Sequence, residues 1–105
     1  MPADAPLDAL GDANRREILR LLAGGGRSVQ EIADRLPISR PAVSRHLRLL
    51  RGAGLVVEEA VGTRRVYRLH DAGLRAVEEY LRTLWGAAGS RFTLAAENLP
   101  TEDRA

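Results

Sequence analysis

Apolar side chains recur along this chain at the spacing of amphipathic helices, and two short stretches between the helices are rich in strand-forming residues. Helices are predicted over residues 13–23, 28–36, 39–51 and 71–99, and strands over 55–59 and 64–69. A short apolar segment with Leu7 and Leu10 precedes the first of these helices. The pattern predicts a mainly α-helical single domain, residues 1–105, with one small β-hairpin.

Polar residues at the helix boundaries support this assignment. Asp12 is a suitable N-cap for the first predicted helix, and Ser28 with Glu31 matches a capping box for the second. Pro37 ends that helix because it moves the preceding residue out of the α region. Ser39 then caps the third helix, so a helix stops and another starts within a few residues.

The third helix has two chemically distinct faces. Its inward positions are apolar: Val43, Leu47 and Leu50. Its outward positions are cationic or hydroxylic: Arg40, Ser44, Arg45, Arg48 and Arg51. A short helix that is apolar behind and cationic in front suits the major groove of DNA.

Basic charge is concentrated in this part of the chain. The formal net charge is only +2, but residues 40–68 hold seven arginines against two glutamates, a local charge of +5. Such a local excess is expected of a surface that contacts phosphate.

The hairpin is expected to add a second cationic contact. Gly62 lies in its turn, and Arg64 and Arg65 follow, where they are expected to reach phosphate or the minor groove. On the second strand, Tyr67 and Leu69 are predicted to share a face that packs on the core.

Within the predicted contact surface, Ser44 and Arg45 are the candidates for base edges because they lie in the middle of the face. Arg40 and Arg51 lie at its ends and suit phosphates. His46 is expected to contact a phosphate or to pack at the edge of the helix. The complete predicted DNA-binding set is Ser39, Arg40, Ser44, Arg45, His46, Arg48, Arg51, Arg64 and Arg65.

The final helix carries an apolar stripe that is too wide for a lone surface helix. Its members are Leu74, Val77, Tyr80, Leu81, Leu84 and Trp85. The stripe therefore predicts a partner. Residues 100–105 are expected to be a frayed tail.

Several other functions find no support in the residues. The chain has no cysteine and only two histidines, on different predicted elements, so neither a metal site nor a cofactor is predicted. No nucleophile and base share a helix face, so no catalytic site is predicted. No stretch is long and apolar enough for a membrane span, and a cytoplasmic location is expected.

The order of these elements resembles the ArsR/SmtB family of bacterial winged helix-turn-helix repressors. The resemblance covers residues 7–85 and is carried by residues 10–19, 28–36, 39–47, 53–56 and 62–69. It implies a homodimer, paired through the first and last helices, that binds a palindromic DNA operator. The implied interface residues are Leu7, Leu10, Leu74, Leu81, Leu84 and Trp85.

The chain departs from the metal sensors of that family. Residues 29–36 contain no cysteine and residues 71–88 contain no histidine, which are the ligand types that the sensors use there. The resemblance therefore implies a dimeric repressor whose effector is unknown and is not a metal. The alternatives are a winged helix that binds only protein and the dimerisation arm of an enzyme, although no Gly-rich nucleotide loop is present.

Overall fold

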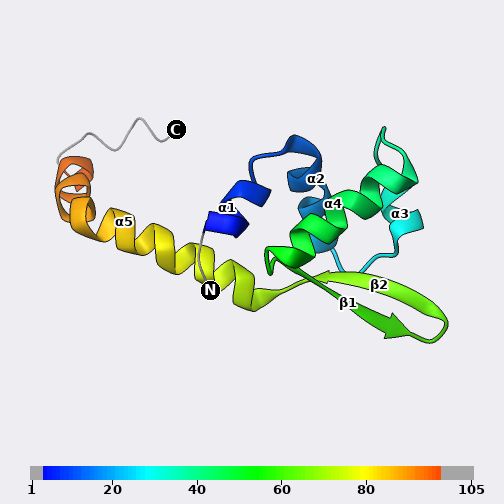
Figure 1. The fold of residues 1–105 in the computed structure, drawn as a ribbon. Helices are drawn as coiled ribbons and strands as arrows, with labels where there is room; N and C mark the ends of the chain where they lie inside the picture. Colours follow the sequence, from blue (N-terminus) through cyan, green and yellow to red (C-terminus); the bar gives the residue numbers. More distant parts are fainter. Residues whose placement is uncertain (1–3, 98–105) are drawn as a thin grey trace.

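The computed structural model describes the backbone of residues 4–97 and the side chains of residues 5–86 (Figure 1). The described elements are α1 (Asp4–Ala9), α2 (Ala13–Ala23), α3 (Val29–Ala33), α4 (Arg40–Gly52), β1 (Val56–Val61), β2 (Arg64–Leu69) and α5 (Asp71–Glu97). The fold class is as the sequence predicts, a mainly helical winged helix with a small hairpin. The predicted tail at 100–105 lies outside the described residues.

The helix starts are fixed by the polar side chains that the sequence indicates. Asp12 Oδ1 accepts hydrogen bonds from the backbone N–H groups of Asn14 and Arg15, at 2.8 and 3.1 Å. Both halves of the capping box form: the Glu31 N–H donates to Ser28 Oγ, and the Ser28 N–H donates to Glu31 Oε1. These bonds satisfy N–H groups that a helix leaves unpaired at its first turn.

Three boundaries differ from the prediction. The segment around Leu7 is a helix, α1, rather than only an apolar entry. Helix α3 ends at Ala33, because residues 34–36 turn more tightly on the way to Pro37. Strand β1 runs from Val56 to Val61, two residues further than expected, since the turn needs only two residues.

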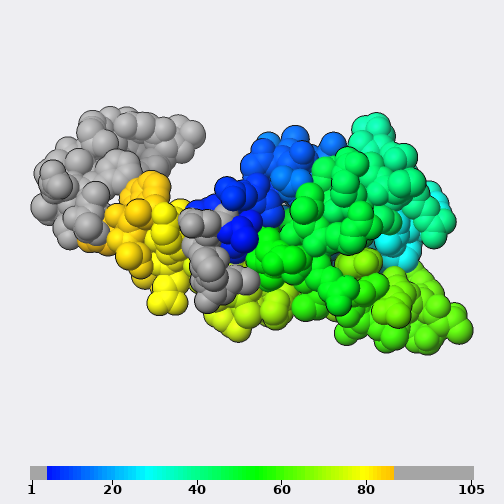
Figure 2. Space-filling view, in the orientation of Figure 1, coloured from blue at the N-terminus to red at the C-terminus, as the bar shows by residue number. Residues whose placement is uncertain are grey.

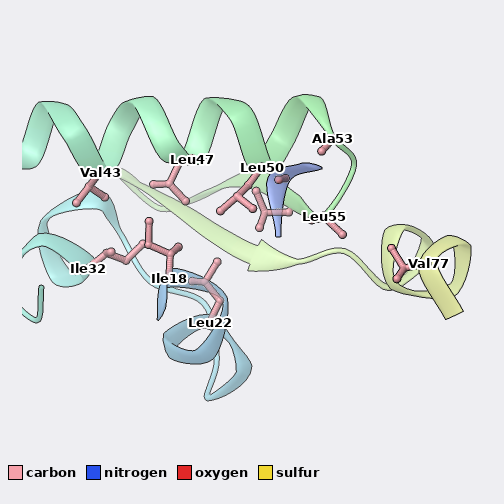
Figure 3. Close-up of a cluster of buried hydrophobic side chains, with 11 residues drawn as sticks. Ile18, Leu22, Ile32, Val43, Leu47, Leu50, Ala53, Leu55 and Val77 are labelled. Atoms are coloured by element: carbon pink, nitrogen blue, oxygen red, sulfur yellow. The ribbon is translucent and has the colours of Figure 1, made fainter. Parts of the chain in front are cut away.

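The core lies between α2, α3 and the inner face of α4 (Figure 3). Val43, Leu47 and Leu50 are fully buried, as predicted, and point towards Ile18 and Ile32. Because these side chains come from all three helices, the core fixes the angle at which α4 is presented to solvent.

The hairpin is closed by a two-residue turn and is attached to the body at its base. Val61 pairs with Arg64 across the turn, where Gly62 adopts a φ of +63° that favours glycine. Tyr67 exchanges two backbone hydrogen bonds with Arg27, of 3.0 and 2.8 Å. The hairpin is therefore a wing anchored to the connection between α2 and α3.

The predicted core face of β2 is only partly correct. Tyr67 packs against the core, but Leu69 is 38% exposed, and Val66 on the opposite face is buried. Val66 is covered because Gly26 leaves space there: a Cβ at Gly26 would lie 2.5 Å from Val66 Cγ1. Both faces of β2 thus contact the body, which alternation along the strand alone does not reveal.

Helix α5 packs on the body only through its first turns. Val77 is buried at the edge of the core, and the helix then projects away from α1–α4 and the wing (Figure 1). Gly73 makes the packing possible, since a Cβ there would lie 1.9 Å from the carbonyl oxygen of Gly54. Among residues 4–97, the structure contains no helix long and apolar enough to cross a membrane.

Candidate nucleic-acid interface

Helix α4 and the wing form neighbouring parts of one face of the molecule (Figure 2). Helix α4 has 13 residues, a length of about 20 Å at the standard rise. Its side chains divide as predicted, with the apolar stripe in the core and Arg40, Arg45 and Arg48 exposed on the other side. A helix of this length presented in this way fits a major groove.

Three of the four arginines on α4 are available for an outside partner. Among the described residues, the side chains of Arg40, Arg45 and Arg48 make no hydrogen bond and no ion pair. Ser44 is half-buried beside them, and the Ser39 hydroxyl accepts the Ala42 N–H at 3.2 Å as the helix cap. The part of the outward face formed by Arg40, Arg45 and Arg48 is therefore cationic, with no carboxylate partner within the described residues.

His46 does not belong to this cationic face. Only 7% of the residue is exposed, and its Nδ1 atom is buried without a hydrogen-bond partner. The physical reason is the period of the helix: residues three apart lie on the same side, so His46 lies beside Val43 and the buried stripe. The burial of the ring favours the predicted alternative in which His46 packs at the edge of the helix, and its contact with a phosphate stays a prediction.

The remaining predicted arginines are paired with glutamates of the same chain. Arg51 donates to Glu58 at 2.9 Å, and Arg65 approaches the other oxygen of Glu58 at 3.7 Å. Arg64 donates to Glu31 of α3. A further wing arginine, Arg68, pairs with Glu59. The sequence pattern does not predict that Glu31, Glu58 and Glu59 pair with these arginines.

Pairing changes the expectation for the wing. The side chains of Arg64 and Arg65 are 56% and 72% exposed, so each can still reach a phosphate, but only by leaving or sharing a carboxylate. The spacing of charges along the sequence does not predict that these arginines pair with glutamates. The only related signal is the hairpin itself, whose antiparallel register places Glu58 opposite Tyr67.

Glu31 illustrates how closely the wing is tied to the helix-turn-helix. The hydrogen bond from the Ser28 backbone N–H lowers the pKa of the Glu31 carboxyl, and the Arg64 guanidinium lowers it further. The same carboxylate therefore caps α3 and holds the wing beside its turn.

An apolar surface lies at the opposite end of the molecule. Leu74, Leu81, Leu84 and Trp85 on α5 are 54%, 40%, 48% and 52% exposed. Leu7 and Leu10, predicted to join them, are half-buried and pack against the core. Leu10 and Leu74 meet at an apolar cavity of about 170 Å³ beneath the start of α5.

No group of three or more His, Asp or Glu side chains in the described part of the chain is placed to hold a metal ion. The structure also brings no nucleophile and base together at the α4 face.

Comparison with known proteins identifies the family. A helix-turn-helix domain model matches residues 10–59. The HTH-type transcriptional regulator Rv2034 of Mycobacterium tuberculosis is 47% identical over 85 residues, which are 81% of this chain and 79% of that protein. The ArsR-like transcriptional regulator from Rhodococcus sp. RHA1 superposes with a TM-score of 0.77 at 30% identity, over 94% of this chain and 93% of that one. The chain belongs to the ArsR family.

Membership in this family makes the protein a DNA-binding transcriptional regulator rather than an enzyme. The transcriptional repressor SdpR of Bacillus subtilis is a further relative, 36% identical over 64% of this chain and 74% of its own length. The exposed arginines of this regulator lie on the α4 face and the wing.

Proposed function

We propose that this protein is a dimeric repressor that binds a palindromic operator through α4 and the wing of each protomer. The observation that carries the proposal is the exposed arginine face of α4, formed by Arg40, Arg45 and Arg48, which has no carboxylate partner in the part of the chain that the structure describes. Guanidinium groups bind phosphates and guanine edges with paired hydrogen bonds, and a rigid helix holds them in register. A regulator of this kind works in the cytoplasm, where bacterial chromosomes lie.

The apolar surface of α5 supports the dimer. Leu74, Leu81 and Trp85 recur at intervals of seven and four, so they form one stripe along the helix, and Leu84 lies beside it. Exposed apolar stripes of this kind are usually covered by a partner. Two protomers related by a two-fold axis would place two copies of α4 about 34 Å apart, one turn of DNA.

Repression is the simplest consequence of such binding, because a dimer seated on a promoter excludes polymerase. The SdpR relative is named a transcriptional repressor, which agrees with repression. The effector remains open in this proposal, but we do not assign a metal. Cysteine is absent from the chain, and residues 71–86 of α5 contain no histidine.

The test is fluorescence anisotropy with two duplexes across a salt series. One duplex is the region upstream of the protein's own gene, and the other is its scrambled sequence. We expect at least about a thousandfold preference for the upstream region at physiological salt. With about eight phosphates neutralised per dimer, log K should fall with a slope near −7 against log salt.

Two outcomes would contradict the proposal. Equal binding to both duplexes would argue for non-specific coating of DNA. No binding to either duplex at low salt would leave the winged helix as a protein-interaction module.

A further inference from the structure

Glu58 is more buried than Glu31 and Glu59, the two other glutamates that pair with arginines of the wing. It is the third residue of β1 and stands opposite Tyr67 in the hairpin. Its side chain is only 16% exposed, compared with 44% for Glu31 and 46% for Glu59. A carboxylate so placed has its direction fixed by the strand and its neighbours.

Three side chains from two elements, α4 and β2, converge on this carboxylate. Oε1 accepts a hydrogen bond from Arg51 Nη1 of α4 at 2.9 Å. Oε2 accepts one from the Tyr67 hydroxyl of β2 at 3.3 Å, and Arg65 Nη1 of β2 lies 3.7 Å from the same oxygen. Glu58 therefore joins the last turn of α4 to the wing.

Arg51 and Arg65 both belong to the predicted DNA-binding residues, yet both are restrained by Glu58. Their side chains stay 59% and 72% exposed, so the pairing holds them at the surface without covering them. The pairing is local to this corner, because Arg40, Arg45 and Arg48 have no carboxylate partner among the described residues. The cationic face is thus divided into an unpaired centre on α4 and a restrained edge beside the wing.

We propose that Glu58 is a positioning residue that raises the specificity of DNA binding by restraining Arg51 and Arg65. This inference rests on the function proposed above. Phosphate contacts carry no sequence information, and each one adds to binding on any duplex. Arginines that swing freely find a phosphate on every sequence. Arginines held by Glu58 contact phosphates only where the helix and the wing are correctly seated.

The substitution Glu58→Gln tests this proposal because it removes the charge and keeps the shape. Its affinities for the upstream and scrambled duplexes are measured by anisotropy across a salt series. We expect affinity for the scrambled duplex to rise about tenfold, with a salt slope steeper by one to two per protomer. Affinity for the upstream region should rise by less, so the preference between the duplexes falls several-fold.

Glu59→Gln is the matched control. It removes the same charge one residue away, from a carboxylate that pairs with Arg68 and, among the described residues, makes no hydrogen bond or ion pair with α4. We expect it to leave the preference between the duplexes within twofold of the parent protein. Thermal unfolding of both variants separates changes in binding from changes in stability.

Three results would overturn the inference. The first is that Glu58→Gln binds both duplexes with the parent's affinity at every salt concentration. The second is that Glu58→Gln loses affinity for both duplexes to the same extent. The third is that Glu59→Gln loses as much of the preference for the upstream duplex as Glu58→Gln does. If the parent protein binds neither duplex, the proposed function itself fails. That outcome is distinct, because it appears before any variant is measured.

Discussion

At the scale of single residues, the environment of each arginine decides its availability. Arg45 lies on the exposed side of α4 with no carboxylate partner among the described residues, whereas Arg51, Arg64 and Arg65 each have one. Sequence spacing predicts the outward direction of Arg45 correctly, because a helix has a fixed period. It does not predict the pairing of Arg51 and Arg64, because their partners are 7 and 33 residues away.

Arg45→Ala is therefore expected to weaken DNA binding with the fold intact. The expected loss is about 1–3 kcal/mol on the upstream duplex, with relaxed preference at the base it contacts. Anisotropy titration measures it. Arg20→Ala, on the exposed side of α2, is the control and should bind like the parent. Equal losses for both variants would show that only net charge matters.

Asp12 gives stability a dependence on acid pH. The hydrogen bond from the Arg15 N–H lowers the pKa of this carboxyl below 3.8, and bonding to Asn14 adds to the shift. Since the folded pKa is the lower one, the stabilisation is complete above the unfolded value. It is lost as the pH falls through the folded value.

Asp12→Asn keeps a capping side chain but does not titrate. Between about pH 5 and about pH 3, its free energy of unfolding should therefore fall less than that of the parent protein. Urea unfolding at several pH values measures this. Glu78→Gln, a change at an exposed position of α5, should follow the parent curve. A parent-like curve for Asp12→Asn would assign the acid sensitivity to other carboxylates.

At the scale of elements, contact between α5 and the body depends on Gly73, because this residue has no side chain. The first turn of α5 approaches the Gly54 carbonyl so closely that only glycine fits at residue 73. The sequence shows a glycine inside a predicted helix, where glycine lowers helix propensity, but not the surface that requires it.

Gly73→Ala is expected to lower the free energy of unfolding by about 1–3 kcal/mol, because the added methyl group overlaps backbone that cannot move aside easily. Gly86→Ala, on the same helix with open space around it, should be neutral or stabilising by up to about 1 kcal/mol. Urea unfolding of the two variants measures both effects. Similar values would mean that helix propensity, not the close approach, governs residue 73.

At the scale of the whole molecule, the two ends have different chemistry. Cations gather on α4 and the wing, and exposed apolar side chains gather on α5, which projects from the other side of the body (Figure 1). This separation would allow a protomer to bind DNA and a second protomer without competition between the two surfaces.

Leu81→Glu is expected to produce a folded monomer, since Leu81 is 40% exposed in the single chain and a charge would be buried only in the dimer. Sedimentation velocity measures the change in mass, and circular dichroism checks the fold. Val61→Glu, an exposed apolar residue on the wing, is the control and should keep the parent's association state. An unchanged mass for Leu81→Glu would remove α5 from the proposed interface.

Local periodicity and capping explain which features of this protein can be predicted from its sequence. Helix starts at Asp12, Ser28 and Ser39, the buried stripe of α4 and the existence of the hairpin all follow from residues close together in the chain. The tertiary structure decided the burial of His46 and Val66, the need for Gly73 and the convergence of two arginines on Glu58. These depend on distances between elements that are far apart in the chain, and only packing brings those elements together.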